Sequence, residues 1–244
     1  MVEFVEDDDP KTTGNGKFLS SLDGNINYWN QSEARCEGFL VDPPPHNKQY
    51  FKHQIEAVKN YYLNISNNQI DFTYDVLEPI YQLEMSMIEY SEISSYDEPN
   101  ESIARLFSDG LTQADNDIDT YLENNDLNEE DILIVVFHAG VGEDYGFDGY
   151  VDPANYDIRS AYIDSEIASF FPDHITISKG ILLPETLNLI YYSTIEDIYG
   201  YQSQGLCDIQ MGMTGLFSYL LGYEFGLPEM FDRNTGTTGL GVFE

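Results

Sequence analysis

Basic residues are scarce in this sequence. Its 244 residues include 10 lysines and arginines but 44 aspartates and glutamates, for a formal net charge of -34. A surface of this sign repels phosphate backbones and anionic membrane surfaces, so we do not expect nucleic acid as a partner. The acidic residues are spread among apolar ones and form no tail. This pattern is typical of a heavily solvated surface, and cation binding is the alternative.

Cysteines and long apolar runs are also scarce. Cys36 and Cys207 lie far apart in the sequence. They could form a disulfide or remain free thiols, so cysteine usage does not indicate the redox compartment of the protein. No apolar run reaches the roughly 18 residues of a membrane-spanning helix, so we expect no membrane span. The first residues are acidic, unlike those of a secretory signal. Both ends resemble cuts, so we expect residues 1–244 to be a single domain from a longer protein.

Motifs for several other functions are missing. The glycine-rich stretches have neither Walker spacing nor a full dinucleotide fingerprint, and no G-x-S-x-G elbow occurs. Cys36 follows an arginine, but no nearby histidine supplies the base that a cysteine nucleophile needs. The four histidines, His46, His53, His138 and His174, form no H-x-x-x-H pair. We therefore expect them to be structural or surface residues, with His138, at the end of a strand, as the strongest candidate for a ligand contact.

Hydrophobic patterning is well developed. The composition is 42% hydrophobic and 14% aromatic, which is ample for a packed core. Apolar spacing predicts an α/β fold with a mixed sheet and no internal repeat. The expected strands and extended segments are 2–6, 69–78, 131–140, 154–164 and 174–185, and the expected helices are 47–66, about 101–123 and about 212–225. Alternating apolar residues predict the half-buried strand 69–78, and a continuous apolar run predicts that 131–140 is buried on both faces.

The last helix raises the question of function. The stretch "GLFSYLLGYEFGLPEMFD" leaves almost no polar face, which predicts a helix buried in the domain interior. Gly226 fits a left-handed C-terminal cap, and Pro228 ends the helix. The glycine, Leu-Pro and following Asp also follow the zinc-binding helix of one class of secreted metallopeptidase, in which H-E-x-x-H supplies two zinc ligands and a catalytic glutamate.

Several blocks carry the resemblance in the same order along the chain. They are "VEFVEDDDPKTTGNGKF", "PPPHNKQYFKHQIEAVKNYY", "VVFHAGVGEDYGFDGYVDPANYDIRSAYID", "GILLPET" and "FGLPEMFDRNTGTTGLGVF". Nearly end to end, the chain resembles the catalytic domain of the immune inhibitor A family of secreted zinc metallopeptidases. The resemblance implies a zincin-like α/β domain whose active-site helix lies near the C-terminus. It also implies a secreted or cell-surface protein.

The resemblance places the two metal histidines of the family at Tyr219 and Tyr223, and its catalytic glutamate at Leu220. A phenol, with a pKa of about 10, is a poor zinc ligand at neutral pH. Leucine neither accepts a proton nor orients a water. Glu229 offers one carboxylate near the motif, which is too little to hold zinc alone. We therefore expect no zinc and no catalytic residue at these degenerate positions.

Acidic loops suggest a different cation. Asp144, Asp148, Asp152 and Asp157 are grouped in one loop, and Asp7 to Asp9 form an acidic turn. The simpler interpretation is a solvated loop. The alternative is a calcium site that rigidifies it, because calcium prefers hard oxygen ligands, although the spacing of an EF-hand is absent.

Two functional hypotheses follow. The first is a noncatalytic homologue of the peptidase domain, retained as a binding or structural module for a protein or peptide. The second is an active metallopeptidase that takes its ligands from other positions or from beyond Glu244. Zinc binding separates the two hypotheses, and the sequence leaves the partner and the oligomeric state open.

Overall fold

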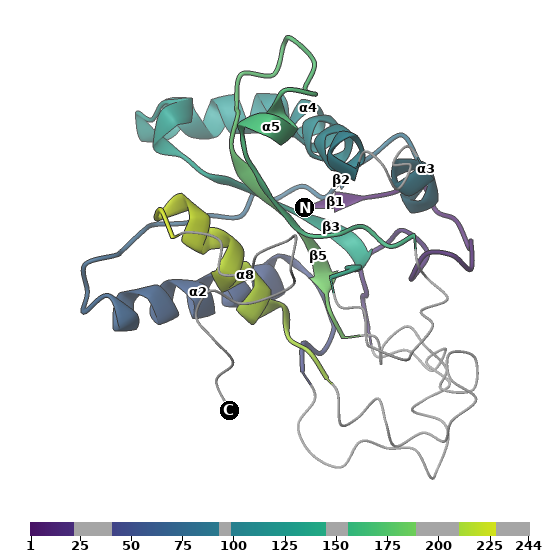
Figure 1. Cartoon of the computed structure of the whole chain (residues 1–244), viewed down its shortest axis with the longest axis horizontal. Coiled ribbons are helices and arrows are strands. Elements are labelled where there is room, and N and C mark those ends of the chain that lie inside the picture. The colour runs from purple at the N-terminus through teal and green to yellow at the C-terminus, as the bar shows by residue number, and fades with distance from the viewer. Residues whose placement is uncertain (22–40, 93–98, 145–155, 189–209, 228–244) are drawn as a thin grey trace, which may run out of the picture.

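A five-stranded mixed sheet with helices on both faces forms the centre of the molecule (Figure 1). The computed structural model describes residues 1–21, 41–92, 99–144, 156–188 and 210–227. The strands are β1 (Val2–Glu3), β2 (Tyr81–Gln82), β3 (Ile134–Val141), β4 (Ala161–Ile163) and β5 (Gly180–Thr186). The helices are α2 (Lys48–Ile65), α3 (Met87–Glu92), α4 (Pro99–Asn125), η1 (Glu129–Asp131), α5 (Ser165–Ala168) and α8 (Met213–Glu224).

The sheet has the order β2-β1-β3-β5-β4. Its first four strands run parallel, and β4 pairs antiparallel with β5 at one edge. Figure 1 shows α3, α4 and α5 on one face of the sheet and α2 and α8 on the other. The predicted α/β class with a mixed sheet is therefore confirmed.

The central strand β3 is covered from both sides, as its continuous apolar run predicts. On one face, the ring of Phe137 stacks on Phe51 of α2 at 4.5 Å and meets Phe217 of α8 edge-on at 5.9 Å. On the other face, Val136 lies against Gly110 of α4, where a Cβ atom would come within 3.6 Å of the valine side chain. The three long helices were each predicted from helical spacing, and all three form.

Residues 69–78 do not form the predicted strand. The segment is extended, but it belongs to no ladder of the sheet. Its alternation has another cause: Phe72 and Val76 pack toward the core, while Asp71 and Asp75 point out and pair with lysines of α2. A chain that lies along a helix produces the same period of two as a strand in a sheet, because in both cases one side of an extended backbone is buried.

The described residues include no helix that is both long and apolar enough to span a membrane.

Candidate functional site

Helix α8 carries the positions that the sequence singled out. Its end matches the predicted glycine cap: Gly226 has a φ of 78° and its amide donates to the carbonyl of Tyr223, while the amide of Leu227 donates to Gly222. These two bonds form a Schellman motif, in which glycine avoids the strain of the left-handed backbone. The helix thus ends at Glu224, with Phe225 as its C-cap and Gly226 in the left-handed position that follows.

Tyr219 and Tyr223 lie one turn apart on the same face of α8. Their hydroxyl groups share a hydrogen bond, and their ring centroids are 5.2 Å apart at an interplanar angle of 74°. Both residues are half-buried, and Leu220 is buried in the core with 6% of its surface exposed. Five of the 12 residues of α8 are buried, six are half-buried and Gly215 is exposed, so the helix is less deeply buried than its apolar sequence predicts.

This donor set does not fit zinc. Catalytic zinc sites in proteins use imidazole, thiolate and carboxylate ligands. The α8 positions instead present two phenols bonded to each other and one aliphatic side chain. No group of three or more histidine, cysteine, aspartate or glutamate side chains suitable for a metal occurs among the residues that the structure describes.

A polar cluster lies beside the tyrosines and was not anticipated from the sequence. The ring centroids of Tyr162, on the edge strand β4, and Tyr223 are 5.6 Å apart. The hydroxyl of Tyr162 donates to Glu224 at 2.9 Å. The other carboxylate oxygen of Glu224 accepts from Lys179 at 2.5 Å. Burial, followed by the bond to Glu224, raises the pKa of Tyr162 to about 12. This phenol therefore stays protonated at neutral pH and acts as a donor.

The contact between α2 and α8 fixes the position of the helix that carries Tyr219, Leu220 and Tyr223. The hydroxyl of Tyr62 on α2 donates to the carbonyl of Ser218 at 2.6 Å. Gly222 allows this close approach, because a Cβ atom there would lie 3.0 Å from the same hydroxyl. The ring of Phe225 packs edge-on against Tyr62 at 4.8 Å. Aromatic packing and one hydrogen bond therefore hold the helix in place.

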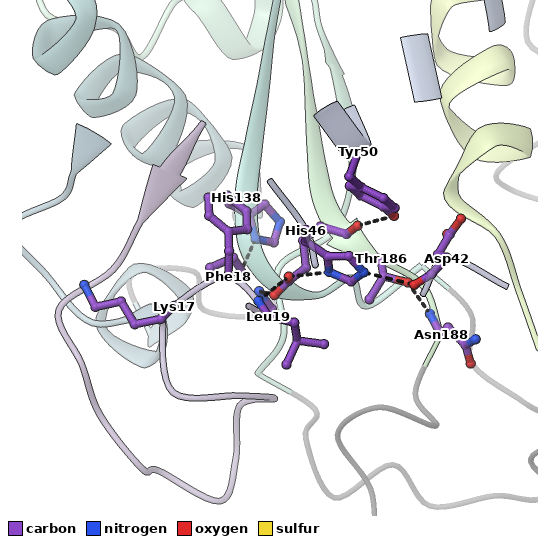
Figure 2. A network of polar contacts seen from close by, with 12 residues as sticks. Lys17, Phe18, Leu19, Asp42, His46, Tyr50, His138, Thr186 and Asn188 are labelled. Carbon is purple, nitrogen blue, oxygen red and sulfur yellow. Dashed lines mark hydrogen bonds and ion pairs between the residues drawn. The ribbon is translucent and has the colours of Figure 1, made fainter. Parts of the chain in front are cut away.

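A buried network reaches the start of the same helix (Figure 2). Gly212, at the N-cap of α8, has no side chain to cap the helix, and Asp42 supplies a carboxylate that accepts from the amide of Met213 at 2.9 Å. The second oxygen of Asp42 accepts from Gln54 of α2 at 2.8 Å. A carboxylate at this end also complements the helix dipole.

Glu185 and His46 form the centre of this network, and both side chains are completely buried. One oxygen of Glu185 accepts from the amide of Gly140 at 2.7 Å, and the other accepts from Leu19 at 3.0 Å and meets Nδ1 of His46 at 2.6 Å. Nε2 of His46 lies 2.9 Å from the carbonyl of Asp42. The two ring nitrogens of His46 therefore bond in opposite directions, one to the Glu185 carboxyl group and one to the Asp42 carbonyl.

The network connects segments that are distant in sequence. It ties the ends of β3 and β5 to the loop before α2 and, through Asp42, to the first turn of α8. The ring of Tyr50 stacks on His46 at 4.3 Å, and its hydroxyl donates to the carbonyl of Glu185 at 2.8 Å. The sequence carried one signal for it: a glutamate within the otherwise apolar strand "GILLPET" needs a buried partner.

His138 is buried without taking part in the network. Its Nδ1 donates to the neighbouring carbonyl of Ala139 at 2.8 Å, and Nε2 has no hydrogen-bond partner. The ring meets Phe4 edge-on at 5.8 Å. Burial lowers the pKa of His138 to about 4, so the ring is neutral at physiological pH. The expected structural role of the four histidines fits these positions, since His53 and His174 are exposed.

We expect His138→Leu to reduce the acid sensitivity of the fold. The unfolded chain binds a proton at this histidine near its ordinary pKa of 6.5, but the folded chain does so only near 4. Stability is therefore lost as the pH falls from 6.5 to 4, by a total of about 3 kcal/mol for this group. Urea unfolding across this range measures the difference between the two proteins. The exposed control His174→Leu should keep the wild-type slope, and an unchanged slope in His138→Leu would refute the assignment.

The acidic residues proposed for calcium are only partly described. Asp148 and Asp152 lie outside the described residues, as do Cys36 and Cys207. Asp144 accepts from the amide and hydroxyl of Ser160 at 2.9 and 2.7 Å. Asp157 accepts from the amide of Thr13 at 2.6 Å and from its hydroxyl. Both carboxylates thus connect loops by hydrogen bonds, and burial raises the pKa of Asp144.

Calcium binding stays a prediction that a melting experiment tests. A ligand that binds only the native state stabilises it by about 2.7 kcal/mol at a hundredfold excess over the dissociation constant. We expect a higher melting temperature in calcium than in a chelator at matched ionic strength. The variant Asp148→Asn should reduce the difference. Identical melting temperatures in both solutions would exclude the site.

Comparisons of the chain with models of protein families, with curated proteins and with solved structures found no match. The functional argument therefore depends on the residues themselves.

Proposed function

We propose that this chain is a noncatalytic homologue of the immune inhibitor A metallopeptidase domain. It is a zincin-like scaffold retained to bind a protein or peptide, as part of a secreted or cell-surface protein. The ordered blocks of sequence resemblance support the family. The mixed sheet and the partly buried helix near the C-terminus are consistent with the fold that this resemblance implies.

One observation supports the proposal that the chain is noncatalytic. At the three positions where the family has two histidines and a glutamate, Tyr219 and Tyr223 bond to each other and Leu220 fills the core. Neither phenol is an effective ligand at neutral pH, and no carboxylate is available there to activate a water. All three roles are therefore lost together.

The free-energy cost of burying a charged side chain also supports this proposal. A glutamate buried at position 220 without a metal would lose its hydration and gain no partner. Leucine at this position adds apolar burial instead, and the paired phenols satisfy each other. These replacements suit a scaffold selected for stability and binding.

A cleavage assay tests the proposal. We expect purified protein to leave a casein-type substrate intact, both with added zinc and with a chelator. A mock preparation, taken through the same purification steps from cells that lack this gene, controls for contaminating proteases. Chelator-sensitive cleavage above that control would favour the alternative, an active metallopeptidase with ligands at other positions.

A further inference from the structure

The extended segment 70–78 runs along α2, at a distance from the helix α8 positions discussed above. Residues on one side of it, Phe72, Tyr74 and Val76, pack against the core. The intervening residues Asp71, Thr73 and Asp75 are exposed. The side chains therefore alternate as in a β-strand, although the backbone joins no sheet.

One edge of this segment faces α2. Asp75 accepts from the amide of the next residue, Val76, at 2.7 Å and also pairs with Lys52 of α2 at 3.4 Å. Asp71 pairs with Lys59 at 2.8 Å and is similarly placed against the amide that follows it. Both carboxylates thus lie between α2 and the amides of the even-numbered residues. The even-numbered backbone groups therefore point toward α2.

The opposite edge has no partner. In an extended chain, the N–H and C=O groups of successive residues point to opposite edges, so those of Asp71, Thr73, Asp75 and Leu77 point away from α2. Within the described part of the chain, these backbone groups accept or donate no hydrogen bond. Buried backbone groups are almost always paired, so we place this edge in water. An exposed row of such groups is a template for another strand.

We propose that the edge formed by Asp71, Thr73, Asp75 and Leu77 binds an extended, positively charged segment of a partner protein by adding a β-strand. The main-chain hydrogen bonds supply affinity, and alternate side chains supply specificity. The seven residues from Asp71 to Leu77 extend about 23 Å as a strand, which is enough for a typical strand of the partner.

Charge selects the partner. The chain has a net charge of -34, and two copies would repel each other at this edge. Although each pairs with a lysine of α2, the side chains of Asp71 and Asp75 stay 61% and 51% exposed, so a lysine or arginine of an added strand can share them. A basic segment is therefore favoured over a second copy.

An eight-residue peptide of alternating valine and lysine serves as the probe. Added to the whole chain, it should slow the hydrogen exchange of the amides of Thr73 and Asp75 at least tenfold, and it should leave those of Phe72 and Val76 little changed. The matched peptide with alternate N-methylated amides keeps the charge and the side chains but lacks the donors. We expect it to bind at least tenfold more weakly.

A pair of variants at one exposed position provides the second arm. Thr73→Pro removes the central amide donor of the edge and should abolish binding, whereas Thr73→Ala should bind like the wild type. If Thr73→Pro does not fold, the comparison of the N-methylated peptide with the unmethylated peptide tests whether main-chain hydrogen bonds hold the partner. Equal binding of both peptides, the absence of protection at 73 and 75, or protection of these amides by self-association would each overturn the proposal. None of these outcomes depends on whether the chain cleaves casein.

Discussion

Glu185→Gln is expected to lower the free energy of unfolding by about 1–3 kcal/mol for each buried donor that it leaves unpaired. The carboxylate accepts from Gly140, Leu19 and His46 in a site without solvent. Glutamine has nearly the same shape, but its amide nitrogen would place hydrogens against at least one of these donors.

Urea unfolding at neutral pH measures this effect. Glu78→Gln is the matched control, because Glu78 also pairs with a basic side chain, Lys48, but is 85% exposed. An exposed pair contributes at most about 1 kcal/mol, so the control should change stability little. Similar losses in the two variants would show that the buried pair does not hold the network together.

The triple change Tyr219→His, Leu220→Glu and Tyr223→His is expected to destabilise the protein without creating a peptidase. Leu220 is buried, so a glutamate there lacks a partner, and each unsatisfied buried polar group costs about 1–3 kcal/mol. The change also removes the hydrogen bond between the two phenols. The substrate-binding groups around an active site would need to be restored as well.

Thermal unfolding and the casein-type assay, each with and without zinc, examine the triple variant. Leu220→Met is the control for volume, and it should cost less than about 1.5 kcal/mol because it keeps an apolar side chain. A triple variant that folds stably, binds zinc and cleaves peptide would mean that the rest of an active site is intact.

The sequence predicted the long elements of this fold because their patterns have few alternatives. Helices α2, α4 and α8 each repeat apolar residues over three or more turns, and β3 has a continuous apolar run. The period-two pattern of residues 69–78 was ambiguous, since a strand in a sheet and an extended segment along a helix bury the same alternate residues. The two-residue strands β1 and β2 are too short for periodicity to place their ends.

The surroundings of the degenerate motif were less predictable. The apolar character of α8 predicted a helix packed against the core, because the pattern lies within one segment of the chain. His46 and Glu185 meet across 139 positions, and Asp42 caps a helix 171 positions away. Such pairs depend on how the whole chain folds, and no local pattern encodes them.

The central claim is that α8 has lost its metal site, and zinc binding by the purified chain tests it most directly. Protein dialysed against a zinc-buffered solution at neutral pH, followed by elemental analysis, gives the ratio of zinc to protein. We predict substoichiometric zinc, unchanged in Tyr219→Phe and Tyr223→Phe. One tightly held zinc per chain, lost when either tyrosine is replaced, would contradict the account.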